Sequence, residues 1–154
     1  MLDPAQTWAP RTEIYLHFAA RAEHLERTIL PALADGVTVV CDRFADSTMA
    51  YQGFGLGAET ALITALTALL PVHPDLTLVL DATAGVSDAR LWQRDQGLDR
   101  YERMDAGFHV RVRAGYRFIA DRDAGRCVLI PADGTVAEVE ADIRRVVTAR
   151  LTPG

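Results

Sequence analysis

Lysine is absent from this chain of 154 residues, so arginine carries all sixteen of its positive side-chain charges. The planar guanidinium group of arginine suits bidentate contacts with phosphate. The net charge of −5 argues against a general nucleic-acid binder, because such proteins usually present a basic footprint. The net charge does not exclude binding of a small anionic ligand, because such a ligand contacts local arginines and is little affected by the charge of the whole chain.

Cysteine is scarce, and long apolar runs are missing. Cys41 and Cys127 form no CxxC pair, so neither a zinc site nor a redox motif is indicated. Both lie in apolar runs and are expected to be buried thiols, as in a reducing compartment. No run approaches the ~20 apolar residues of a membrane span, and the first residues do not resemble a signal peptide. These absences predict a cytoplasmic protein that does not bind membranes.

Short apolar runs alternate with segments of helical periodicity. Strands are expected at 37–41, 76–80 and 127–130. Helices are expected at 12–34, 59–70, 85–96, 100–124 and, after the capping box Thr135-x-x-Glu138, up to about 151. Strands that alternate with helices predict an α/β protein with a parallel sheet, here as one domain over 1–154.

Charged residues follow each expected strand: Asp42 and Arg43 the first, Asp81 the second, and Asp133 the third. Ligands of open parallel sheets bind beyond the carboxyl ends of the strands. An aspartate there can hold Mg²⁺ through water, and an adjacent arginine can clamp a phosphate. Taken alone, the Asp42–Arg43 dipeptide is more commonly the start of a solvated loop after a strand than a ligand site.

Residues 41–53 read Cys-Asp-Arg-Phe-Ala-Asp-Ser-Thr-Met-Ala-Tyr-Gln-Gly. This segment resembles the signature of thymidylate kinases, which is Asp-Arg-aromatic, a Ser/Thr pair and Ala-Tyr-Gln-Gly. Residues 16–21, 74–81 and 99–102 look like three further segments of that family and occur in the family's order. The resemblance covers nearly the whole chain and implies phosphoryl transfer from ATP to dTMP, giving dTDP, with Mg²⁺.

The resemblance implies an acceptor-nucleotide site in the first half of the chain. Arg43 would contact the phosphate of dTMP, and Asp42 would support Mg²⁺ through water. Arg21 would reach the acceptor nucleotide, although without the family a solvated helix-face arginine is the likelier interpretation. Three further residues would line the pocket around base and sugar: Ser47, Tyr51 and Gln52. His17 stands where the family usually has the phenylalanine that stacks on thymine, which leaves a related nucleotide as an alternative substrate.

The second half of the chain resembles the donor side of the family. The lid region would contain Arg90, Arg94 and Arg100, and the last two would act with Asp42 and Arg43 in catalysis by neutralising charge on the transferring phosphoryl group. Tyr101 and Glu102 follow the lid and would contact substrate, and Asp133 lies where the family holds adenine. The remaining arginines of this region, Arg111, Arg113 and Arg117, are expected to form a solvated stripe, with one lid contact as the alternative.

The chain departs from the family in a second and more severe respect: it contains no G-x-x-x-x-G-K-[ST] sequence, the loop that holds the ATP phosphates. Met1 aligns inside the family, just before the nucleotide-facing helix. We therefore expect an N-terminally truncated, incomplete form of the P-loop nucleoside-monophosphate-kinase fold, a three-layer α/β/α parallel sheet without its central P-loop strand and second strand. The alternative function is a non-catalytic remnant or a partner-dependent nucleotide-binding fragment. The family commonly dimerises through its helices, which suggests a homodimer, while the sequence leaves the oligomeric state open.

Overall fold

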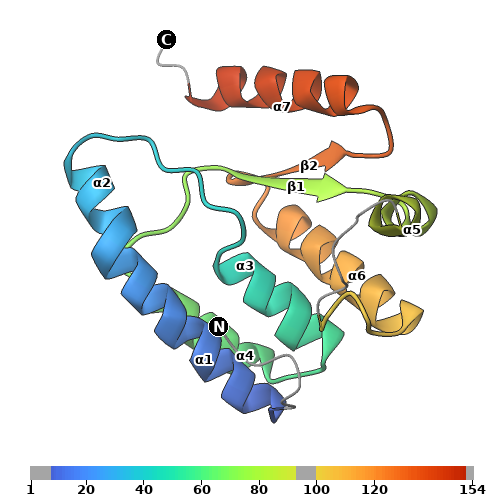
Figure 1. Cartoon of the computed structure of the whole chain (residues 1–154). Helices are drawn as coiled ribbons and strands as arrows, with labels where there is room; N and C mark the ends of the chain where they lie inside the picture. The colour runs from blue at the N-terminus through green and yellow to red at the C-terminus, as the bar shows by residue number, and fades with distance from the viewer. Residues whose placement is uncertain (1–7, 93–99, 152–154) are drawn as a thin grey trace. The chain divides into compact units, whose positions relative to one another are not determined.

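The computed structural model describes residues 8–92 and 100–151, and the chain divides into two units, Met1–Val72 and His73–Gly154 (Figure 1). The first unit is helical. The second contains a small parallel sheet with helices. Each unit is described by itself, and a single domain over 1–154 stays a prediction.

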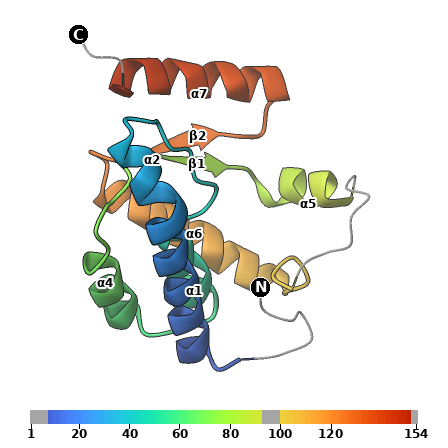
Figure 2. The same cartoon turned by 60° about the vertical axis from the view of Figure 1, so that its left-hand side comes forward.

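The first unit begins with one long helical segment (Figures 1 and 2). It comprises α1 (Pro10–His24), the π-helical turn η1 (Leu25–Ile29) and α2 (Leu30–Ala34). The π-helical turn ends two residues before Pro31, which has no N–H and therefore removes one bond from the helical ladder. Gly36, with a φ of 74°, ends the segment in the left-handed conformation that glycine adopts readily. The helix expected over 12–34 is confirmed.

Residues 37–41 do not form the strand that their β-branched sequence predicts. The segment leaves the helix as irregular chain, and the side chains of Val37 and Val40 are 54% and 94% exposed. A strand needs a hydrogen-bonded neighbour, and no described residue pairs with this segment. The sequence prediction was wrong because apolar β-branched residues favour an extended chain but do not supply that neighbour.

Three shorter helices complete the first unit: α3 (Ala45–Thr48), the π-helix η2 (Met49–Gly55) and α4 (Thr60–Ala68). Ile14 and Phe18 of α1 pack with Ile63 of α4 in a buried cluster. Burying an isoleucine or phenylalanine side chain contributes about 1.5–3 kcal/mol. This cluster therefore holds α1 against the helices that follow it, and the helix expected over 59–70 is confirmed.

The second unit contains the described sheet of two parallel strands, β1 (Thr77–Asp81) and β2 (Cys127–Pro131). Their register pairs Thr77 with Cys127 and Asp81 with Pro131. Helices α6 (Ala106–Arg122) and α7 (Val136–Leu151) lie on opposite faces of the pair, and α5 (Ala84–Trp92) follows β1 (Figure 1). The parallel pairing, the second and third expected strands and the layered α/β arrangement are confirmed.

The helix expected over 100–124 begins later than its sequence suggested. Residues 100–103 form turns, and the Asp105 carboxylate accepts a hydrogen bond from the Phe108 N–H at 2.7 Å. An aspartate N-cap satisfies one of the unpaired N–H groups of the first turn, so the helix starts at Ala106. The capping box before α7 is confirmed: Glu138 accepts from the Thr135 N–H at 2.7 Å, and Thr135 Oγ accepts from the Glu138 N–H at 3.3 Å.

Within the described parts of the chain, no helix is long and apolar enough to cross a bilayer.

Candidate functional site

The Asp42–Arg43 turn lies between the irregular segment 37–41 and α3. Arg43 has a φ of 66°, in the left-handed region that residues other than glycine rarely adopt. Both side chains are exposed, and the Arg43 guanidinium lies 4.9 Å from the centre of the Tyr51 ring. Strained backbone of this kind clusters at binding sites, so the turn is a candidate ligand contact.

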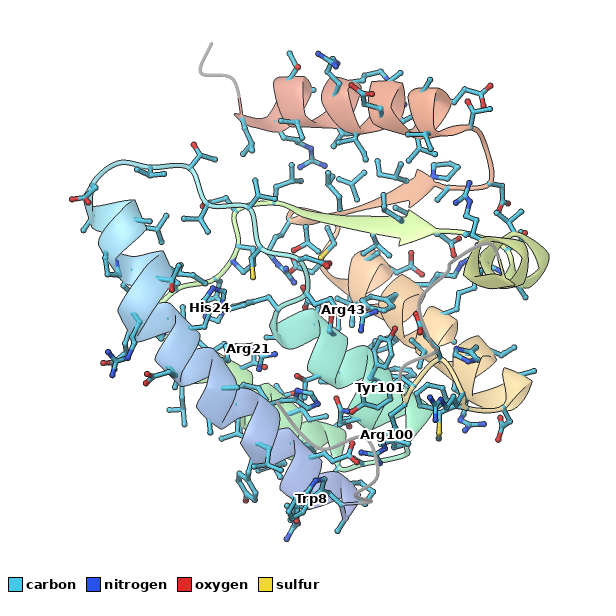
Figure 3. The ribbon with its side chains drawn as sticks, viewed as in Figure 1. Trp8, Arg21, His24, Arg43, Arg100 and Tyr101 are labelled. Carbon is cyan, nitrogen blue, oxygen red and sulfur yellow. The ribbon has the colours of Figure 1, made fainter. Side chains whose placement is uncertain are left out.

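Arg21 extends from α1 toward the beginning of α3 (Figure 3). Its Nη2 donates to the Phe44 carbonyl at 2.9 Å and to Thr48 Oγ at 3.1 Å. Its guanidinium carbon lies 4.7 Å from the Phe18 ring centre and 5.2 Å from that of Phe44. Arg21 is therefore held between two aromatic rings and is not the solvated helix-face arginine that the sequence alone favours.

The other terminal nitrogen of Arg21, Nη1, is buried and has no hydrogen-bond acceptor among the described residues. Burial lowers the pKa of the Arg21 guanidinium and outweighs the nearby Cys41 and Asp46, which raise it. The group stays charged all the same, because arginine is not deprotonated in proteins. A buried donor on a charged group costs more than the ~1–3 kcal/mol of a neutral one when it is left unpaired. An anionic ligand is the kind of group that would satisfy this donor.

The α1 face that carries Arg21 also carries two polar residues at helical spacing, Glu13 and His17. Residues four apart lie on one face of a helix. Glu13 is fully buried and accepts a hydrogen bond from Gln52 Nε2 at 3.3 Å. His17 is half-buried between Glu13 and Arg21 along the helix. The sequence prediction missed Glu13, although its spacing from His17 and Arg21 was a usable signal.

The acceptor-site residues predicted in the first half of the chain all lie in the first unit. They are His17 and Arg21 in α1, Asp42 and Arg43 in the turn, Ser47 in α3, and Tyr51 and Gln52 in η2. Ser47 and Tyr51 are half-buried, whereas Gln52 is buried against Glu13. Because π-helical segments occur frequently at functional sites, η2 is a reasonable location for two pocket residues.

The loop after β2 is fixed by two sets of hydrogen bonds in the second unit. Arg90 of α5 donates to the carbonyls of Ala132 and Gly134, both at 2.7 Å. The Asp133 carboxylate accepts from the Thr83 N–H at 2.7 Å and from Thr83 Oγ at 3.1 Å. In this conformation, Arg90 orders the loop that contains Asp133, a role that the sequence did not reveal.

Three further predicted site residues precede α6: Arg100 of the lid region and the substrate-contacting Tyr101 and Glu102 that follow it. The Arg100 guanidinium carbon lies 5.7 Å from the Tyr101 ring centre, and Tyr101 stacks on the buried Phe108 with ring centres 6.2 Å apart. Glu102 is half-buried in the same turn. Arg94 lies outside the described residues. The stacking on Phe108 connects the residues after the predicted lid to the buried side of α6.

Asp81, the last residue of β1, is bound by two arginines of α6. Arg113 donates from Nε to Oδ1 at 2.6 Å and from Nη2 to Oδ2 at 3.2 Å. Arg117 donates from Nε and Nη2 to Oδ2, at 3.0 and 2.5 Å. The hydrogen bond from Arg113 is the main reason that the Asp81 pKa lies below its ordinary value. Arg113 and Arg117 are therefore ion-paired and do not form the expected solvated stripe.

Two further features bear on ligands. An open depression of about 490 Å³ adjoins the loop after β2; it is lined by Pro131, Gly134, Glu138, Val139, Ala141 and Asp142.

The described residues contain no cluster of three or more His, Cys, Asp or Glu side chains that could hold a metal ion. Among these residues, a cation would depend on ligand oxygens or water in addition to single carboxylates.

Residues 1–143 match the family model "Thymidylate kinase". The thymidylate kinase of Caulobacter vibrioides is 49% identical over 149 residues, covering 96% of this chain and 71% of that protein. That of Cereibacter sphaeroides is 47% identical, covering 88% and 65%. The crystal structure of thymidylate kinase from Ehrlichia chaffeensis superposes with a TM-score of 0.73 at 31% identity, covering 94% and 67%. The chain thus spans about two thirds of the length of these relatives.

Proposed function

The chain belongs to the thymidylate kinase family, and on that basis we propose that it acts in the transfer of the γ-phosphoryl group of ATP to dTMP, giving dTDP. The observation that carries the proposal is the buried Nη1 of Arg21, which has no acceptor among the described residues. A phosphate oxygen supplies both the charge and the hydrogen-bond acceptor that this nitrogen lacks.

Arg21 and Arg43 bind the dTMP phosphate in this proposal. Arg21 is held in place by the Phe44 carbonyl, Thr48 and two aromatic rings, so little conformational entropy is lost when it meets a ligand. Arg43 lies on the strained turn with its side chain exposed over Tyr51. Two guanidinium groups neutralise the acceptor phosphate, which otherwise repels the incoming phosphoryl group.

The base and sugar of dTMP lie along the α1 face and η2. Ser47 and Tyr51 contact the nucleotide directly, and His17 stacks on the base. Gln52 acts with Glu13: their buried hydrogen bond fixes η2 against α1 and so sets the distance between the two walls of the pocket. This division of roles assigns a positioning function to Glu13.

Asp42 holds Mg²⁺ through water in this proposal. It offers one exposed carboxylate beside the phosphate-binding arginine, and Mg²⁺ usually keeps several waters and binds through one or two carboxylates together with substrate phosphates. A single carboxylate therefore fits a Mg²⁺ ion that is held mainly by water and substrate phosphates, and not one that is bound by protein ligands alone. When bound, the ion supplies neutralisation of charge on the reacting phosphates.

The lid and ATP side is formed by Arg90, Arg94, Arg100 and Asp133, and Tyr101 and Glu102, which follow the lid, contact substrate. Arg90 acts through the loop that it orders, and that loop carries Asp133 at the position assigned to adenine. The chain has no G-x-x-x-x-G-K-[ST] sequence, the motif that holds the β- and γ-phosphates in P-loop enzymes. That absence favours a second candidate function, nucleotide binding without turnover, and the two are separated by assaying ADP release.

The test is equilibrium binding of dTMP to the purified chain by calorimetry. Arg21→Lys keeps the charge but loses the planar fork, and we expect dTMP affinity to fall roughly 10- to 100-fold. Arg27→Lys is the matched control, since Arg27 lies on the same helical segment, is exposed and pairs with Glu23. Equal affinities of the two variants would refute the assignment of Arg21. Parallel titrations with dUMP and dCMP determine the base preference that His17 sets.

A further inference from the structure

The Asp81–Arg113–Arg117 cluster is not accounted for by the acceptor site, because it lies in the second unit and uses residues outside the predicted lid. It sits at the carboxyl end of β1, and ligands of open parallel sheets bind at that edge. The loop containing Asp133 leaves the neighbouring strand at the same edge, since Asp81 pairs with Pro131 in register. The position of the cluster is therefore one at which a ligand is expected.

The cluster has more positive than negative charge. Two guanidinium groups share the single carboxylate of Asp81, whose side chain is only 11% exposed. Asp133 also interacts electrostatically with Arg113, but Arg90 binds the carbonyls on both sides of Asp133. Among these five side chains, three arginines thus meet two aspartates.

The hydrogen bonds of the cluster leave defined donors available. Asp81 occupies Nε and Nη2 of both arginines, and no described residue accepts from the Nη1 group of either. The side chains of Arg113 and Arg117 are 37% and 53% exposed. Asp81 therefore holds two partly exposed guanidinium groups in fixed positions, and each has an Nη1 group without an acceptor among the described residues.

We propose that Arg113 and Arg117, oriented by Asp81, form a binding site for a polyphosphate chain. Two neighbouring cationic donors fit an anion with charged oxygens on adjacent phosphorus atoms, and guanidinium groups recognise phosphate oxygens with charge-assisted hydrogen bonds. The polyphosphate is either free or part of a nucleotide. The nucleotide case rests on the proposed function, in which it is the phosphate chain of the donor.

The experiment is calorimetric titration of the full chain with tripolyphosphate and, separately, with ATP, both without dTMP. Arg117→Gln removes one guanidinium group, and we expect tripolyphosphate affinity to fall about tenfold, the effect of about one charge-assisted contact. Arg117→Lys keeps the charge and should lose less. Arg145→Gln is the control, because Arg145 is also an exposed arginine paired with an aspartate, Asp142 on α7. Circular dichroism verifies that each variant is folded.

An affinity of Arg117→Gln equal to that of the wild type, or an equal loss in Arg145→Gln, overturns the site. If Arg117→Gln does not fold, the wild-type chain with ¹⁵N-labelled arginine gives the answer: the Nε–H resonances of Arg113 and Arg117 must shift on titration, and their constancy at saturating tripolyphosphate contradicts the proposal. Tighter binding of ATP than of tripolyphosphate identifies the nucleotide as the ligand. Because dTMP is absent throughout, failure of the Arg21 test and failure of this one are independent results.

Discussion

Two arginines of the first unit illustrate what individual residues contribute and how far the sequence predicts it. Resemblance to a family signature singled out Arg21 and Arg43, but it could not show that Arg21 is inserted between Phe18 and Phe44 with a buried nitrogen lacking an acceptor. The contacts with Phe44 and Thr48 join segments more than twenty residues apart in sequence. The local sequence pattern contains no information about partners so distant in sequence. For the same reason, the burial of Glu13 against Gln52 was not predicted.

The left-handed backbone of Arg43 predicts an unusual response to substitution. A residue with a Cβ is strained at a φ of 66°, whereas glycine is not. We expect Arg43→Gly to be more stable toward unfolding than Arg43→Ala by about 0.5–1 kcal/mol, although both lose the side chain that binds phosphate. Urea denaturation of the two variants measures the difference. A more stable alanine variant would show that the turn is not strained in solution.

Close packing of helices predicts the effect of enlarging Gly53 in η2. A Cβ at this position would lie 3.2 Å from Met49 Sδ and from Thr60 Cγ2, and 3.3 Å from Ile63 Cδ1. We expect Gly53→Ala to destabilise the fold by about 1–3 kcal/mol through overpacking. Gly125→Ala is the control, because nothing lies within 4 Å of its added Cβ, and it should change stability by less than about 0.5 kcal/mol. Thermal unfolding monitored by circular dichroism compares them; equal melting temperatures would contradict the packing described for η2 and α4.

The attachment of α6 to β1 through Asp81 predicts a pH dependence. Its folded-state pKa is lowered, chiefly by the hydrogen bond from Arg113, so the unfolded chain takes up the proton more readily. The stabilisation is fully present above the ordinary aspartate pKa of about 4 and is lost as pH falls through the lowered folded value. We expect Asp81→Asn to be less stable than wild type at pH 7 and the gap to narrow below pH ~4. Denaturant titrations at pH 7 and pH 3 measure it; a gap that is unchanged between them would exclude this ion pair as the cause.

Helices predicted from apolar spacing or a capping box were confirmed, whereas one predicted strand did not form and one helix began later than predicted. The helix over 12–34 follows from its apolar spacing, and α7 follows from its capping box. Residues 37–41 have a strand sequence but no described partner. The start of α6 depended on Asp105, whose capping role the periodicity of apolar residues does not reveal.

At the scale of the whole molecule, the family was predictable because its motifs occur in order along nearly the entire chain, and the match over residues 1–143 confirms it. Most of the predicted acceptor residues lie in the first unit, whereas Tyr101, Glu102 and the predicted lid and ATP-side residues lie in the second. Kinase activity requires both sets to act on one pair of nucleotides. The proposed function therefore draws on residues of both units.

The most direct test is to incubate the full chain with Mg²⁺, dTMP and ATP carrying a labelled γ-phosphate, and to separate the products. The proposed function predicts labelled dTDP, formed only when dTMP is present, with formation abolished in Arg43→Ala and retained in Arg27→Ala. Absence of labelled dTDP from the wild-type reaction, or its undiminished formation by Arg43→Ala, would contradict it.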